Sequence, residues 1–171
     1  MGNAMTTDFL KECMADSLLK LMENSDFSKI TVNEIAAGAN VNRSTWFRNF
    51  DTKINALTFK LVRLWERWAE EHKLAEPRRY TPDNALDFFR FNYAYRRILT
   101  QICVSGQQTA IYDAFNQVLT PRFFEGTDET YVNRFYAYGL YGLLEEWIHR
   151  DFRESPEEMT RLFMQNIAGR S

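Results

Sequence analysis

Residues 39 to 53, "ANVNRSTWFRNFDTK", combine many hydrogen-bond donors with large aromatic rings. A core segment would not carry so many donors, and a plain surface helix would not carry one Trp and two Phe. Arginine and lysine side chains bind phosphate, while arginine, serine and threonine can hydrogen-bond to the edges of bases. Contact with a polyanion is therefore the chemistry that this stretch offers.

Other chemistry has little support in the sequence. Glu145 and His149 have the i, i+4 spacing that could share a metal ion, but no second His or Cys is near, and an ion pair is the better interpretation. His72 lies among charged neighbours. Cys103 lacks a basic neighbour that would activate its thiol. The sequence has no nucleophile elbow, P-loop or dinucleotide fingerprint, so we predict neither an enzyme nor a bound metal or cofactor.

The composition indicates a mostly helical chain with one basic segment. Only 7 Gly and 4 Pro interrupt 171 residues, of which 45% are hydrophobic. The net charge is −2, yet residues 42–67 hold six bases against two acids, and residues 125–160 hold three bases against nine acids. The two Cys are far apart and no run is long enough to span a membrane, so we expect a reduced, cytoplasmic protein without a membrane segment.

Helix-start signals divide the chain. Capping boxes are expected at Thr31 with Glu34, Ser105 with Gln108 and Ser155 with Glu158, and first-turn prolines follow Thr81 and Ser155. Residues 1–4 resemble an expression scar, and residues 75–81 a connector. We predict helices, and no strands, over residues 7–23, 31–38, 42–49, 52–74, 82–103, 105–119, 128–150 and 156–168.

Two short helices joined by a short turn match a helix-turn-helix. Ile35, Ala36, Val41 and Phe50 are placed to pack the pair together, and Asn40 suits a left-handed turn. The N-terminus of the second helix would face phosphate and bases, with Lys53 just beyond it on a phosphate. The alternative is a solvated helix pair in an ordinary bundle, which explains Trp46 poorly.

The segment "FSKITVNEIAAGANVNRSTWFRNFDTKINAL", from Phe27 to Leu57, resembles the DNA-binding segment of TetR-type (tetracycline-repressor-like) transcriptional regulators. The resemblance runs without a gap. It implies an N-terminal three-helix DNA-binding domain, a connecting helix, a helical effector-binding domain, and a homodimer that binds palindromic operators. "GLYGLLEEWIHRDFRESPEEM" is similar, more weakly, to the end of such a chain.

The resemblance also implies roles for single residues. Thr31 and Lys53 correspond to phosphate contacts, and Arg43, Ser44 and Thr45 fall where the family reads bases. At three positions the chain differs from the residue that is usual in the family: it has Asn40 in place of Gly, Phe47 in place of Tyr and Asn49 in place of His. Because Phe47 has no hydroxyl, a phosphate contact through that group is missing. The complete predicted DNA-binding set is Thr31, Asn42, Arg43, Ser44, Thr45, Trp46, Phe47, Arg48 and Lys53.

We expect the DNA-binding domain to span residues 5–57 and an effector-binding and dimerisation domain to span residues 58–171. The helix at 128–150 is apolar nearly all round, which predicts that it faces a core on one side and a second chain on the other. A central helix of a monomer is the alternative. The predicted dimer interface comprises Tyr138, Gly139, Tyr141, Gly142, Glu145 and Phe163.

Aromatic residues in the second half are candidates to line an effector pocket, because small-molecule sites have apolar walls with a few polar groups. Most of them could equally be plain core. The predicted pocket residues are Phe88, Phe91, Asn92, Tyr95, Cys103, Tyr112 and Phe115.

The function that these features predict is a ligand-responsive, sequence-specific DNA-binding regulator, a repressor that binds a palindromic operator as a homodimer. Its partners would be operator DNA, a small-molecule effector and a second copy of the chain. The alternative is a helical module that binds a protein or non-specific nucleic acid without operator preference.

Overall fold

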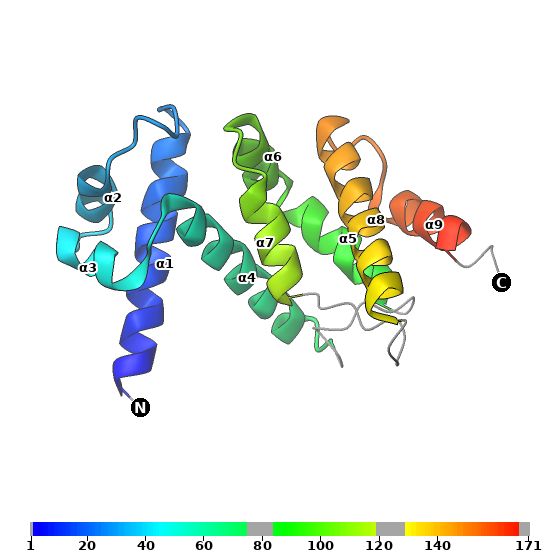
Figure 1. Cartoon of the computed structure of the whole chain (residues 1–171), viewed down its shortest axis with the longest axis horizontal. Helices are drawn as coiled ribbons and strands as arrows, with labels where there is room; N and C mark the ends of the chain where they lie inside the picture. The colour runs from blue at the N-terminus through cyan, green and yellow to red at the C-terminus, as the bar shows by residue number, and fades with distance from the viewer. Residues whose placement is uncertain (1, 75–83, 119–128, 168–171) are drawn as a thin grey trace. The chain divides into compact units, whose positions relative to one another are not determined.

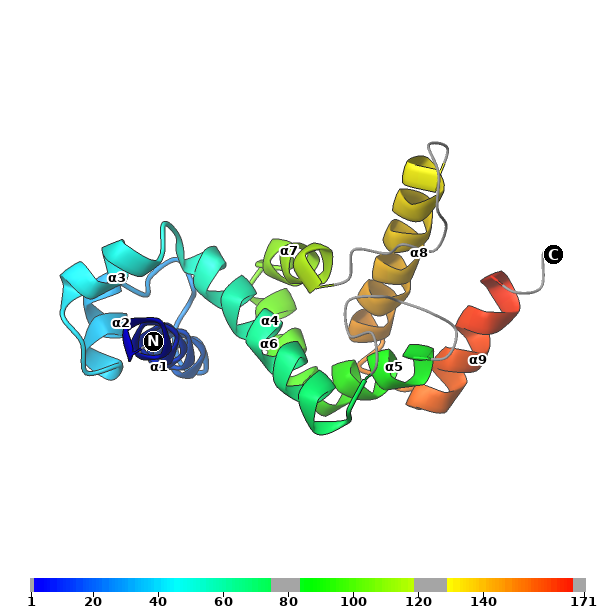
Figure 2. The same ribbon diagram turned by 90° about the horizontal axis from the view of Figure 1, so that it is seen from below.

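The computed structural model describes residues 2–74, 84–118 and 129–167 (Figures 1 and 2). These ranges contain helices and no strand, so the all-α prediction is confirmed. None of the helices described is both long and apolar enough to cross a bilayer. The predicted connector and the Thr81–Pro82 helix start lie outside the described residues. The helices are α1 (Gly2–Met22), α2 (Val32–Gly38), α3 (Arg43–Asn49), α4 (Lys53–Glu71), α5 (Ala85–Ala94), α6 (Arg96–Val104), α7 (Thr109–Val118), α8 (Glu129–His149) and α9 (Pro156–Ile167).

Contacts within the chain divide it into two compact units. The first comprises Met1–Leu64 with Gln101–Ala114, and the second comprises Trp65–Thr100 with Phe115–Ser171. The division falls within α4, α6 and α7, so each of these helices contributes residues to both units. The domain boundary expected after residue 57 stays a prediction from the sequence.

In the first unit, α1 packs against α2 and α3 (Figure 1). Met14, Leu18 and Ile35 are fully buried at this contact layer. The hydroxyl of Ser17 donates a buried hydrogen bond of 2.9 Å to the carbonyl oxygen of Ile35. A Cβ atom added at Gly38 would lie 2.3 Å from that same hydroxyl oxygen, so α2 approaches α1 as closely as it does because position 38 has no side chain.

The helix-turn-helix segment forms α2, a short turn and α3, as expected. Thr31 and Glu34 make a complete capping box at the start of α2. Asn40 has a φ of 55°, the left-handed conformation predicted for the turn, and the N–H of Val41 returns to the carbonyl oxygen of Ala36 at 2.9 Å. The turn is therefore fixed by local hydrogen bonding and by a residue type that tolerates positive φ.

Several predicted boundaries are wrong. α1 begins at Gly2, and so runs through residues 2–4, which the sequence suggested were an expression scar. The helix expected over 82–103 is two helices, because the chain changes direction at Tyr95 (φ −100°, ψ 17°). Ser105 does not cap α7, since its hydroxyl donates to the carbonyl oxygen of Gln101 at 2.8 Å. Gly106, at φ 71°, follows α6, and α7 begins only at Thr109.

The second unit has an aromatic core, in which α5 lies beside α9 (Figures 1 and 2). The ring of Phe89 is 5.7 Å from that of Trp147 and 6.3 Å from that of Phe163, centroid to centroid. The indole N–H of Trp147 donates to the carbonyl oxygen of Glu154 at 3.0 Å, which fixes the loop before α9. Phe163 is only 2% exposed and fills the core of its own chain, so its burial does not support its predicted place in a dimer interface.

Candidate nucleic-acid interface

The short helix α3 separates its side chains into two faces. On one face Thr45 and Trp46 are buried, and the ring of the adjoining Phe50 packs against that of Trp46 in a tilted arrangement, 5.2 Å between centroids. The other face exposes five members of the predicted DNA-binding set together. These are Asn42, Arg43, Ser44, Phe47 and Arg48.

Two members of the predicted set are not available on this surface. Trp46 is 1% exposed and anchors α3 in the core of the first unit, so its burial does not support its predicted place in the DNA-binding set. Thr45 is 8% exposed, and its hydroxyl oxygen accepts a hydrogen bond from Arg48 at 3.3 Å. A base-reading role for Thr45 is therefore not supported by its burial.

The N-terminus of α3 is open. Asn42 occupies the N-cap position, but its side chain makes no capping hydrogen bond. The first turn contains no acidic residue and begins with Arg43. The guanidinium of Arg43 lies over the ring of Phe47, 5.1 Å from its centroid. Because helix N-termini carry outward-facing N–H groups and partial positive charge, this end of α3 favours an anion.

The backbone N–H and the hydroxyl of Thr31 are both hydrogen-bonded within its own chain. Its backbone N–H and its hydroxyl both donate to one carboxylate oxygen of Glu34, at 2.8 and 2.7 Å. The hydrogen bonds from the Thr31 side chain and backbone lower the pKa of Glu34 below its ordinary value of 4.5, so the carboxylate is charged near neutral pH. A phosphate at Thr31 would have to displace this carboxylate.

Lys53 also bonds to its own chain. Its ammonium donates to the carbonyl oxygens of Phe27 and Ile30, the latter at 2.8 Å, and lies 4.4 Å from the centroid of the Phe27 ring. Burial lowers the pKa of Lys53 from its ordinary value of 10.5. An ammonium has three donors, so one remains for a phosphate. Lys53 thus ties the loop before α2 to the start of α4, whatever else it contacts.

Other bases of the segment at residues 42–67 are paired with acids. Lys60 is 7% exposed, and its ammonium lies 2.7 Å from a carboxylate oxygen of Asp16 and 3.6 Å from one of Glu12. Arg63 lies 3.5 Å from the second oxygen of Glu12. The positive charge that the sequence suggested for this segment is therefore partly neutralised by α1, and the basic surface narrows to α3 and the start of α4.

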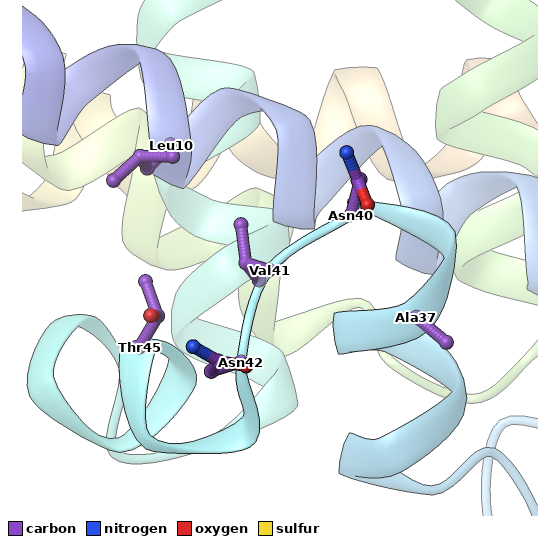
Figure 3. Close-up of a pocket in the computed structure, with 6 residues that line it drawn as sticks. All are labelled: Leu10, Ala37, Asn40, Val41, Asn42 and Thr45. Atoms are coloured by element: carbon purple, nitrogen blue, oxygen red, sulfur yellow. The ribbon is translucent and has the colours of Figure 1, made fainter.

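A small hollow of about 310 Å³ lies beside this surface (Figure 3). Figure 3 shows Val41 and Thr45 directed toward the helix that carries Leu10, with Asn42 at the edge. No sequence pattern indicated this hollow, because it forms where α1 passes the turn between α2 and α3. Its lining residues are Leu10, Ala37, Asn40, Val41, Asn42 and Thr45.

The predicted effector residues are divided between the two units. Phe88, Phe91 and Phe115 are buried in the second unit, where Phe88 lies 6.0 Å from Phe115 between ring centroids. The buried amide of Asn92 donates to the carbonyl oxygen of Phe88 at 2.8 Å. Tyr95 lies half-buried in the same unit. Cys103 and Tyr112 belong to the first unit.

Trp68 was missed by the sequence analysis. Its indole N–H is buried and has no hydrogen-bond partner among the described residues. Its ring centroid lies 6.0 Å from that of Phe91 and 6.5 Å from that of Tyr95, and the ring of His72 stacks on it at 3.8 Å. A buried donor without an acceptor costs about 1–3 kcal/mol, so an acceptor placed beside this N–H would offset that cost. No periodicity in the sequence could have shown this.

The residues considered for metal binding do not form a site. No group of three or more His, Cys, Asp or Glu side chains is placed to hold a metal ion in the part of the chain that the structure describes. Glu145 is half-buried and His149 is exposed on α8.

Comparison with models of known protein families identifies the family of this chain. A TetR-type family model described as "Transcriptional regulator C-terminal region" matches residues 84–169, half of the chain. The chain therefore belongs to the TetR-type family of transcriptional regulators, as its helix-turn-helix segment had suggested. A search of curated proteins finds no match.

Proposed function

We propose that this TetR-type regulator is a repressor that binds a palindromic DNA operator as a homodimer and releases it when a small molecule binds. One observation carries the DNA-binding part. α3 buries Trp46 and Thr45 on one face while its other face, from Asn42 to Arg48, presents donors and an uncapped N-terminus. A helix held in this way can enter a major groove with its N-terminal residues toward the bases. A cytoplasmic location belongs to the same proposal.

Homodimer formation is supported by the exposed side of α8. Tyr131, Phe135 and Tyr138 are 83%, 74% and 53% exposed. Gly139 and Gly142 are also exposed, and a Cβ atom added at either would meet nothing within 4 Å. Glycine inside a helix costs about 1 kcal/mol relative to alanine. Since no contact among the described residues accounts for that cost, close approach of a second α8 is the reason that we propose.

Effector binding is supported by Trp68. The rings of Phe91, Tyr95 and His72 lie around the ring of Trp68, and its buried indole N–H has no hydrogen-bond partner among the described residues. We propose that this aromatic surface suits a flat apolar ligand. The indole can only donate a hydrogen bond, so the ligand must offer an acceptor such as a carbonyl oxygen. We therefore propose an uncharged aromatic effector that carries a hydrogen-bond acceptor.

Selection of bound duplexes from a random pool tests the central proposal. The full chain should enrich one palindromic sequence whose half-sites lie about 34–36 Å apart, one turn of the double helix. Binding without enrichment would favour the alternative of a non-specific nucleic-acid module, and no binding would favour a protein-binding module.

The variant Arg43→Ala tests whether Arg43 contacts a base. If Arg43 contacts a base, the variant should lose about 1–3 kcal/mol on the enriched sequence and little on a scrambled duplex. Equal losses on both duplexes would show that Arg43 contacts only phosphate.

A further inference from the structure

We propose that Phe47 is a positioning residue that sets sequence selectivity by holding the guanidinium of Arg43 in the orientation needed to contact guanine. The proposal rests on the DNA-binding function proposed above. Arg43 and Phe47 lie one turn apart on α3, and the guanidinium carbon is 5.1 Å from the ring centroid. Both residues lie on the exposed face of α3.

Packing does not explain Phe47. Its side chain is 56% exposed, whereas the neighbouring aromatic rings of Trp46 and Phe50 are buried against each other in the core. An exposed phenyl ring gains little from the hydrophobic effect. The contact that the structure gives this ring is with the cation of Arg43, so the role of Phe47 is to be sought in that pair.

The position of Arg43 makes such a contact useful. Arg43 begins α3, where the helix dipole disfavours a cation and the side chain of Asn42 provides no cap. A free arginine side chain would also sample many rotamers, and fixing it on DNA costs conformational entropy. Stacking on Phe47 restricts the guanidinium before DNA arrives, so part of that entropy is lost in the free protein.

The contact also affects what Arg43 can bind. A guanidinium held over an aromatic ring keeps N–H groups available in a planar fork. That fork matches the N7 and O6 acceptors of guanine in the major groove. Arg48 is held differently, by donating to the Thr45 hydroxyl oxygen at 3.3 Å. Arg43 is therefore the arginine whose base preference depends on Phe47.

A double-mutant cycle tests the proposal. Affinities of the wild type, Phe47→Leu, Arg43→Ala and the double variant are measured at one salt concentration on the selected operator and on a scrambled duplex. Phe47→Leu removes the aromatic face but keeps an apolar side chain. It should lower the ratio of the two affinities about 2- to 5-fold, the value of a cation–π contact at an exposed site. With Arg43→Ala already present, Phe47→Leu should change the ratio no further. Phe47→Tyr keeps the ring and should keep the ratio.

The outcomes separate this proposal from the function on which it rests. A wild type that enriches no sequence overturns both. A wild type that enriches a sequence, with a ratio unchanged by Phe47→Leu, overturns only the role of Phe47. The same holds if Phe47→Leu lowers the ratio equally in the Arg43→Ala background, because the ring would then contact DNA itself. Thermal melting of each variant shows that exposed position 47 leaves the fold intact.

Discussion

The ammonium of Lys53 lies 2.8 Å from the carbonyl oxygen of Ile30, 23 residues earlier in the chain. With the second bond to Phe27, this contact closes the loop between α1 and α2 onto the start of α4. The Thr31 capping box begins one residue after Ile30. A single cation therefore fixes the place at which α2 starts.

Replacing Lys53 should destabilise the protein even without DNA. In Lys53→Met the two carbonyl oxygens lose a charged donor, and we expect a loss of about 1 kcal/mol in the free energy of unfolding. Lys29→Met is the control, since Lys29 is 78% exposed and its bridge to Asp26 is worth little. Denaturant unfolding measures both variants. If Lys53 acted only on phosphate, the unfolding midpoint would stay unchanged and only the salt dependence of DNA binding would fall, by about one ion.

Adding a methyl group at position 38 should disturb the α1–α2 contact. In Gly38→Ala the new Cβ would lie 2.3 Å from the Ser17 oxygen, which must move and give up its bond to Ile35. We expect a loss of about 1–3 kcal/mol in stability. Ser17→Ala removes the clashing oxygen and leaves a Cβ contact of 3.4 Å, so the double variant should lose less than the sum of the single losses. Additive losses would contradict this geometry.

A larger side chain at position 142 should prevent formation of the proposed dimer. In Gly142→Leu the added Cβ atom would meet nothing within 4 Å among the described residues, so the monomer should fold normally, with a helix about 1 kcal/mol more favourable than with glycine. Sedimentation should show monomers where the wild type forms dimers. Val104→Leu adds bulk at a residue that is 83% exposed on α6 and should leave the dimer unchanged. A Gly142→Leu protein that stays dimeric would place the interface elsewhere.

The buried N–H of Trp68 should distinguish ligands of nearly equal shape. Acetophenone carries a carbonyl acceptor that ethylbenzene lacks, and we expect it to bind about 5-fold more tightly, the value of one net hydrogen bond of about 1 kcal/mol. Thermal melting at matched concentrations of each compound measures the difference. Trp68→Phe keeps an aromatic ring without the donor, and it should abolish the preference. Equal stabilisation of the wild type by both compounds would contradict a role for this donor.

The start of α9 should lose stability in acid. The backbone N–H of Ser155 donates to Glu158 at 2.7 Å, and with the Ser155 side chain it lowers the pKa of Glu158 below its ordinary value of 4.5. Because the folded state has the lower pKa, this contribution is complete above pH 4.5 and is lost as the pH falls through the folded pKa. In Glu158→Gln the group cannot titrate. The difference in melting temperature between wild type and variant should therefore shrink in acid, and a difference independent of pH would contradict this.

Local features were predictable from the sequence, whereas contacts between distant residues were not. The capping boxes at Thr31 and Ser155 depend on residues three positions apart, and both formed as expected. The box at Ser105 failed because a left-handed Gly106 precedes α7 and displaces its start.

Within the candidate interface, α3 is only 7 residues long, too short for periodicity to assign its buried face, so the burial of Trp46 was not predicted. Lys53 and Lys60 looked like free cations because their partners lie far away in the sequence, at Ile30 and Asp16. Charge counted along a sequence does not show which cations are already neutralised by a neighbouring helix.

Residues 101–114 belong to the first unit, and this determines where two regulators of this kind could be joined in a chimera. Gln101 donates to the carbonyl oxygen of Leu19 at 2.9 Å, and Thr58 donates to that of Ala110 at 3.4 Å. A chimera joined after Leu64 would pair helices α1 to α3 of one parent with the α6–α7 surface of another. The first unit of such a chimera keeps its native packing only if residues 101–114 come from the same parent as the N-terminal segment.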